Sequence, residues 1–341
     1  PRRLDPGSFA ALEVRGPVLK FELVTAFFDL VDMKERKSAW RSPEKLRRAG
    51  PEGAAYADFL DGAWEALGPD GRAAVATLSK SSPHPWRLLD TLARLPDDAE
   101  AAEIIAALKA LPTGIFAGGW KAPLAFALDK FYAGSFREYY AREAPLVAAE
   151  ARRVGETMSA GLPEGVLAFM AEEAGVPLDR NRKVAFYYTF QVIGAFGFEA
   201  EGIKISTVQR TSRSPEDLYG TAFHEFGHEV FRTFQGKAAF VAAADKLKAD
   251  KRFLEDYEST GRANYGSWAN WCVENLVNGF SYWLGYRKFG AEPEGGNYRH
   301  DAAFFAFLKE KGFAPSPGAL EKSCIDFLEA SAAKAGARAA P

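Results

Sequence analysis

The chain has 341 residues, enough for one large domain or two ordinary domains, each with a buried core. Its 43 Lys and Arg residues nearly balance 45 Asp and Glu residues, for a formal net charge of −2, and this balance argues against a nucleic-acid partner. The longest apolar stretch, 184–198, contains Thr189 and Gln191 and is shorter than the roughly 18 residues of a membrane helix, so we expect no integral membrane segment.

Residues 1–178 are expected to form an N-terminal, mainly helical region. One apolar stripe with i, i+3, i+4, i+7 spacing is formed by Val24, Phe27, Phe28 and Val31. Asp29 and Asp32 are expected to face away from this stripe. Further helical segments are separated by breaks that contain Pro or Gly, at 42–44, 68–71, 96 and 112.

Residues 179–330 are expected to form a second region, in which strands precede helices. The stretches 183–193 and 203–208 are dense in aromatic and β-branched residues, which is typical of strands, and glycines between them allow turns. Helical texture returns at Pro215 after a possible Ser214 cap. The small, Ala-rich segment 331–341 is expected to be a frayed tail. The sequence therefore predicts an α+β fold that is predominantly helical.

The two cysteines, Cys272 and Cys324, do not form a metal-binding pair. They suit either one disulfide in an oxidising compartment or two isolated buried thiols.

The segment His224-Glu225-Phe226-Gly227-His228 contains two of the four histidines in the chain. On a helix over 215–234, a spacing of four places both imidazoles on one face, one turn apart, as two zinc ligands require. Glu225 lies next to the first of them, where its carboxylate can take a proton from a metal-bound water that attacks a carbonyl. The plainer alternative is a helix with two histidines that bind no metal.

A catalytic zinc needs a third protein ligand, and Glu274 is the best candidate. Phe231 and Phe234 stand where metzincins have a glycine and a third histidine, which excludes that class. Glu274 lies in a helical stretch, 267–286, whose other residues are largely apolar, and a buried acid there needs a metal or a basic partner. Asn270, Glu274 and Asn278 form a polar stripe along this helix, so Asn278 is expected to orient a ligand.

Other residues compete for the roles around the metal. Glu258, or His300 with Asp301, are rivals for the third ligand, although solvated loop positions explain them equally well. For the hydrogen-bond donor to the oxyanion, Tyr265 is the first choice. The alternative donors are Tyr282, Tyr286, Tyr298 and His300.

The strands followed by the His-Glu-Phe-Gly-His helix and a later helix with Glu274 resemble the gluzincins, the thermolysin-like clan of zinc metallopeptidases. The resemblance implies a two-lobed zincin-like fold with a small sheet next to the helix 215–234, one Zn²⁺ per chain and a peptide or protein substrate. It also implies that 203–208 is an edge strand on which an extended peptide pairs. Asn278 replaces the Asp that supports a zinc-bound His in such enzymes, and Tyr265 holds the place of their oxyanion-stabilising Tyr.

A closer likeness is to a group of bacterial gluzincins, carried by the helical segment 21–30, the pair His84-Pro85, and Tyr265 with Trp268. This likeness implies a periplasmic or secreted protein. It leaves the peptide preference open. The alternative to a peptidase is a zinc-binding module that binds peptides or proteins without turnover, which the uncharged Asn278 allows and the intact Glu225 argues against.

Overall fold

The computed structural model describes residues 12–38, 41–81, 85–116, 119–161, 165–178, 183–200, 202–211, 215–293 and 295–339. The chain forms two compact units, one of Pro1–Gly161 with Arg182–Pro215 and one of Leu162–Asn181 with Glu216–Pro341. The strands thus belong to the same unit as the N-terminal helices, and not, as a boundary at residue 178 implies, to the unit of the His-Glu-Phe-Gly-His helix. The cap expected at Ser214 and the pair made by His84 with Pro85 depend on residues outside the described ranges.

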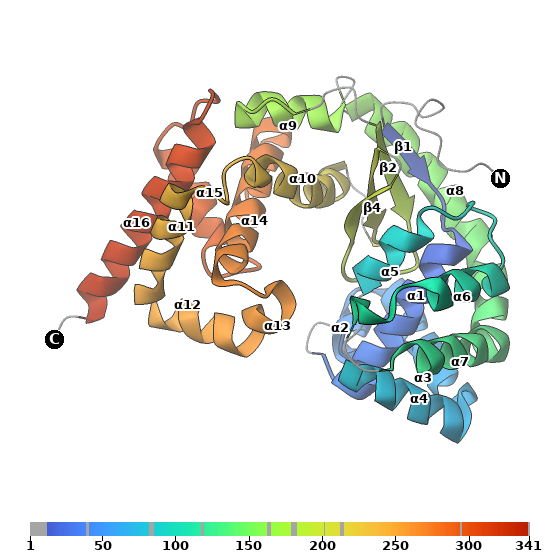
Figure 1. Ribbon diagram of the computed structural model, residues 1–341. Coiled ribbons are helices and arrows are strands. Elements are labelled where there is room, and N and C mark those ends of the chain that lie inside the picture. Colours follow the sequence, from blue (N-terminus) through green and yellow to red (C-terminus); the bar gives the residue numbers. More distant parts are fainter. Residues whose placement is uncertain are drawn as a thin grey trace. The chain divides into compact units, whose positions relative to one another are not determined.

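The first unit is mainly helical with one small sheet (Figure 1). Its helices are α1 Leu19–Val31, α2 Pro43–Arg48, α3 Pro51–Ala66, α4 Gly68–Ser81, α5 Pro85–Leu92, α6 Ala101–Ala110, α7 Lys121–Phe131 and α8 Arg137–Gly161. Short π-helical turns follow α1 at Asp32–Arg36 and α7 at Tyr132–Phe136, and a 3₁₀ turn covers Thr113–Ile115. The prediction of a predominantly helical α+β chain is confirmed.

The sheet has four strands in the order β1-β2-β4-β3. They are β1 Leu12–Arg15, β2 Lys183–Tyr188, β3 Gly197–Ala200 and β4 Ile203–Val208. β1 and β4 both pair with β2 in parallel, and β3 pairs with β4 in antiparallel. The expectation that 203–208 is an edge strand is wrong, because β3 covers its outer side and every residue of β4 is buried. β4 therefore has no free edge on which a peptide could pair.

Both faces of the sheet are covered within the first unit, so the polar residues of β4, Lys204, Ser206 and Thr207, are buried together with its apolar ones. On one face, the Phe21 ring of α1 packs against Tyr187 and Phe198 at centroid distances of 4.8 and 5.5 Å. On the other face, α8 runs along β1, where a Cβ on Gly155 would lie 3.2 Å from Val14 (Figure 1).

Helix α1 is buried on nearly all sides and not only along its apolar stripe. Asp29, expected to face away from the core, is 2 % exposed. Its carboxylate pairs with Arg41 and accepts hydrogen bonds from the Tyr56 hydroxyl at 2.9 Å and the Gln191 amide at 3.0 Å. The charge is tolerated because these donors replace the lost water.

The second unit is helical throughout its described part. Its helices are α9 Val166–Ala174, α10 Pro215–Arg232 from Glu216 onward, α11 Ala238–Lys246, α12 Lys251–Asp256, α13 Arg262–Tyr265, α14 Trp268–Phe289, α15 Asp301–Glu310 and α16 Ala319–Ala339. A 3₁₀ turn covers Leu247–Ala249 and a π-helical turn covers Tyr257–Gly261. α14 packs along α15, and α11 packs along α16.

Helix α16 extends to Ala339, so the expected frayed tail over 331–341 is wrong for most of its length. Its Ala-rich sequence favours helix, and Ala332 is buried. Cys272 and Cys324 are separate buried thiols, and burial raises the pKa of each. No described helix is long and apolar enough to span a bilayer.

Candidate metal centre

Helix α10 presents His224 and His228 on one face. Their ring centroids lie 5.3 Å apart with the ring planes nearly perpendicular, and the two side chains are 19 % and 28 % exposed. An apolar face of the helix is buried, as Phe223 packs on Phe169 and Val230 is fully enclosed. Burial of these flanks fixes the rotation of α10 and hence the direction of the two imidazoles.

Helix α14 supplies Glu274. The hydroxyl of Ser267 caps the start of this helix by accepting a 3.1 Å hydrogen bond from the backbone N–H of Asn270. Glu274 is 6 % exposed. Gly227, between the two histidines, allows a close approach of α14, because a Cβ there would lie 3.1 Å from the Val277 side chain.

The three side chains converge. Oε1 of Glu274 lies 3.2 Å from Nε2 of His224, and Oε2 lies 3.6 Å from Nε2 of His228. In the described part of the chain, these residues form the one group of three or more His, Cys, Asp or Glu residues whose ligand atoms all lie within 4.8 Å of one another.

The donor set fits a zinc ion. Two imidazole nitrogens and one carboxylate oxygen are the protein ligands of a common class of catalytic zinc sites. Four ligands at about 2.0–2.1 Å from an ion form a tetrahedron with edges of about 3.4 Å. The observed separations of 3.2 and 3.6 Å bracket that edge.

The charges of the site are coupled. Burial raises the pKa of Glu274, but hydrogen bonding and charge from the histidines and a hydrogen bond from Tyr298 hold this pKa below its usual value. Burial lowers the pKa of His224, yet the hydrogen bond and charge of Glu274, with the charge of Glu225, raise that pKa to about 9. Burial lowers the pKa of His228 to about 4 against the charge of Glu274. Without a cation, a proton on His224 therefore balances the buried carboxylate.

Glu225 is half-buried on the same helix. Its charge raises the pKa of both His224 and Tyr265, so its carboxylate lies within electrostatic reach of the two. The structure thus places an acid beside the triad without making it part of the triad.

Two tyrosines extend from Glu274. The Tyr298 hydroxyl donates a 3.1 Å hydrogen bond to Oε1 of Glu274, and the Tyr265 hydroxyl lies 2.8 Å from that of Tyr298. Trp271 packs against both rings. The hydroxyl of Tyr265, the donor expected from the sequence, therefore contacts the hydroxyl of Tyr298 beside Glu274.

The polar stripe of α14 faces the site as a set of supporting contacts. The Asn270 amide donates to the backbone oxygen of Tyr265 at 3.1 Å. Asn278 donates to Asp301 and to the Tyr282 hydroxyl, and as an acceptor it raises the pKa of His224. Asn278 thus lies beside His224, one of the three candidate ligands.

The rival ligands lie elsewhere. Glu258 is on the π-helical turn and pairs with Arg262 at 2.5 Å near solvent. His300 contacts Asp250 at 3.3 Å and packs edge-on against Phe253, which ties two segments together. Asp301, considered from the sequence only as a ligand, is fully buried and contacts Asn278. No sequence signal marks this contact, because Asp301 is simply an acid that begins an apolar helical run.

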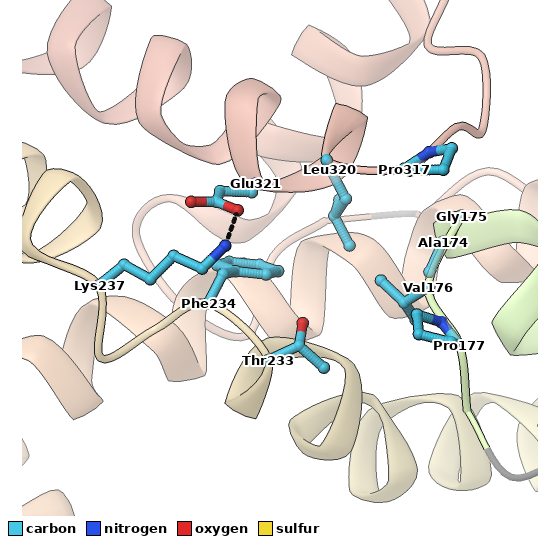
Figure 2. Close-up of a pocket in the computed structure, with 11 residues that line it drawn as sticks. Ala174, Gly175, Val176, Pro177, Thr233, Phe234, Lys237, Pro317, Leu320 and Glu321 are labelled. Atoms are coloured by element: carbon cyan, nitrogen blue, oxygen red, sulfur yellow. Dashed lines mark hydrogen bonds and ion pairs between the residues drawn. The ribbon is translucent and has the colours of Figure 1, made fainter.

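A cavity of about 210 Å³ in the second unit is separate from the triad. Figure 2 shows it between the end of α9, the end of α10 and the start of α16, with Lys237 and Glu321 paired at 2.6 Å. Its walls are mostly apolar, and none of the three candidate ligands lines it. We assign it no part in the metal centre.

Comparison with known proteins does not assign the chain to a family. No protein-family model, curated protein or solved structure matches the chain. The argument for function therefore rests on the residues of the site.

Proposed function

We propose that this chain is a zinc-dependent peptidase in which His224, His228 and Glu274 hold one Zn²⁺. The observation that carries the proposal is the convergence of two imidazole nitrogens and a buried carboxylate at separations of 3.2 and 3.6 Å. The pairing of a two-histidine helix with a Glu-bearing helix, supplied by α10 and α14, also supports the zincin-like arrangement that the gluzincin resemblance implies.

His224, His228 and Glu274 would hold the zinc ion, which would supply a Lewis acid for a water molecule and a substrate carbonyl. Glu225 is the proton acceptor for the attacking water, because it lies next to a ligand and does not occupy a ligand position. The same carboxyl then returns the proton to the leaving amine. Peptide-bond hydrolysis needs both transfers, and one half-buried acid beside the metal can perform them in turn.

The tyrosine pair serves the developing oxyanion. Burial, and then the charge of Glu274, raise the pKa of Tyr265 and of Tyr298, so both phenols keep their protons at neutral pH. A protonated phenol can donate to an anionic oxygen, which stabilises the transition state. Tyr265 remains our choice of donor, because its hydroxyl donates to the uncharged Tyr298 oxygen and can exchange that acceptor for an oxyanion, whereas the Tyr298 hydroxyl donates to the Glu274 carboxylate.

The substrate class is a peptide or protein. The gluzincin resemblance implies this class, and a metal triad with an adjacent acid suits attack on an amide carbonyl. Because β4 is buried, pairing of a peptide with that strand does not support the proposed substrate class.

A peptide-library digest of the zinc-loaded wild type and of Glu225→Gln tests the proposal. We expect hydrolysis by the wild type, a fall by about two to four orders of magnitude in the variant, and unchanged zinc content. Glu258→Gln, which changes an acid outside the triad, should digest the library like the wild type. If wild type and Glu225→Gln bind the same peptides and neither cleaves any, the chain is a zinc-binding module and not a peptidase.

A further inference from the structure

Asp301 has the most hydrogen-bonded carboxylate near the metal centre, although it is not a ligand. It begins α15 and is fully buried. Oδ1 accepts a 2.6 Å bond from the backbone N–H of Ala302. Oδ2 accepts from Asn278 Nδ2 at 2.6 Å, the backbone N–H groups of Asn297 and Tyr298 at 2.8 and 2.9 Å, and the Tyr282 hydroxyl at 3.3 Å. A buried acid with this many donors has a fixed orientation.

The first link from Asp301 to the metal ligands passes through Asn278. The Nδ2 group of Asn278 is committed to Asp301 and to Tyr282. A reversed amide would place the Asn278 oxygen against the Asp301 carboxylate, so Asp301 fixes which end of the amide is an acceptor. The acceptor end is left for His224, which Asn278 adjoins and whose Nδ1 is buried without a hydrogen-bond partner in the described part of the chain.

The second link passes through Tyr298. Its backbone N–H donates to Asp301, while its hydroxyl donates to Oε1 of Glu274. Asp301 thus holds the backbone of the residue whose side chain orients the Glu274 carboxylate. The two links reach two different candidate ligands from one carboxylate.

The packing of α14 and α15 places Asp301 close enough for both links. A Cβ on Gly279 would lie 2.5 Å from the backbone oxygen of Asp301 and 3.1 Å from Phe304 Cβ. Glycine at this position allows α15 to approach the helix that carries Glu274 and Asn278. If Asp301 served only as the first residue of α15, its hydrogen bonds to the backbone N–H groups of Ala302, Asn297 and Tyr298 would suffice. The further hydrogen bond from the Asn278 side chain would not be required.

We propose that Asp301 is a positioning residue of the metal centre, which orients His224 through Asn278 and Glu274 through Tyr298. The inference rests on the proposed zinc site and deepens it. Asn278 is uncharged, and the Asp301 carboxylate to which it donates lies one hydrogen bond farther from His224.

The test compares three variants of the full chain. Asp301→Asn removes one acceptor oxygen from the carboxylate, and Asn278→Ala cuts the link to His224 while leaving the backbone contacts of Asp301 in place. Glu173→Gln is the control, because it neutralises another acid of the second unit, paired with Arg287 at 3.0 Å and outside the triad. For each protein we would measure the Zn²⁺ dissociation constant against a chelator, the visible spectrum of the Co²⁺ form, and the melting temperature without metal.

We expect the Zn²⁺ dissociation constants of Asp301→Asn and Asn278→Ala to rise about 10- to 100-fold, the usual effect of losing an orienting partner. Their Co²⁺ spectra should differ from that of the wild type. Glu173→Gln should melt at a lower temperature but keep the wild-type spectrum and bind Zn²⁺ within about twofold of the wild type, since the triad geometry is untouched.

Zn²⁺ binding by Asp301→Asn within twofold of the wild type would overturn the proposal and leave Asp301 as a helix-start residue. If Asp301→Asn does not fold, Asn278→Ala decides, and an unchanged affinity and spectrum would again overturn it. Wild type that binds no Zn²⁺ would overturn both proposals. Wild type that binds Zn²⁺ but cleaves no peptide would remove only the peptidase, because the affinity comparison still decides the role of Asp301.

Discussion

The hydroxyl of Tyr298 donates to Oε1 of Glu274, the same carboxylate oxygen that lies 3.2 Å from Nε2 of His224. One phenol therefore orients the acid that completes the triad. Tyr265 then binds Tyr298 at 2.8 Å. This chain of contacts divides the two tyrosines into one that donates to a candidate ligand and one whose hydroxyl must leave Tyr298 to reach a substrate oxyanion.

Replacement of each tyrosine by phenylalanine separates these two roles. Tyr265→Phe should lower kcat by about 10²- to 10³-fold, with zinc content and KM nearly unchanged, because it removes a donor used only in the transition state. Tyr298→Phe should instead weaken zinc binding, because Glu274 loses its orienting hydrogen bond. Steady-state kinetics and metal titration measure these effects. A full kcat in Tyr265→Phe with a reduced kcat in zinc-saturated Tyr298→Phe would make Tyr298 the oxyanion donor.

The close contact of α14 with α15 depends on Gly279. Gly279→Ala should destabilise the second unit by about 1–3 kcal/mol, because its methyl group would meet the Asp301 backbone and force the helices apart. Gly285→Ala lies on the same helix with no atom within 4 Å of the added Cβ, and should stabilise it by about 0.5–1 kcal/mol. Denaturant unfolding of the two variants measures the difference. Equal stability would show that α14 and α15 can separate at no cost.

A buried acid in the first unit predicts a pH dependence that the metal centre does not share. Glu22 is fully buried on α1, and its Oε1 has no hydrogen-bond partner in the described part of the chain. Burial raises the pKa of Glu22 well above 4.5, against a hydrogen bond from the Phe190 backbone. The folded state thus favours the protonated acid, and its contribution to stability is complete below pH 4.5 and is lost as the pH rises through the raised pKa, at up to about 1.4 kcal/mol per pH unit.

Glu22→Gln should remove this loss, because the amide stays uncharged. Its melting temperature should exceed that of the wild type at pH 8 by more than at pH 4.5. Glu143→Gln is the opposite control: burial raises the pKa of Glu143, but hydrogen bonds from Arg142 and Arg210 lower it overall, so this variant should lose stability mainly above pH 4.5. If the melting temperatures of wild type and Glu22→Gln change with pH in the same way between pH 4.5 and pH 8, Glu22 is not held protonated in the folded state.

The local patterns of the sequence predicted the elements better than their arrangement. The strand 203–208 and the start of α10 at Pro215 agree with the structure, because β-branched residues and a proline report local backbone preference. β1 was missed because only four residues form it, and it depends on its partner β2. β3 was read as a glycine turn at Gly197. The gluzincin resemblance implied that 203–208 is an edge strand, and β3 occupies that edge.

The site shows the same limit. A spacing of four on a helix fixes the relation of His224 to His228, and a buried acid on an apolar helix marks Glu274. The contact of Asp301 with Asn278 joins residues 23 positions apart across two helices, and neither residue type requires it. Long-range polar contacts of this kind depend on how the helices pack, which the sequence pattern does not encode locally.

Diffraction measured at the zinc absorption edge, on crystals of protein loaded with Zn²⁺, tests the central claim most directly. The account predicts one anomalous peak per chain, about 2.0–2.2 Å from Nε2 of His224, Nε2 of His228 and an oxygen of Glu274. A peak bound instead by Glu258 or His300, or no peak at these three atoms in protein that contains zinc by metal analysis, would contradict the account.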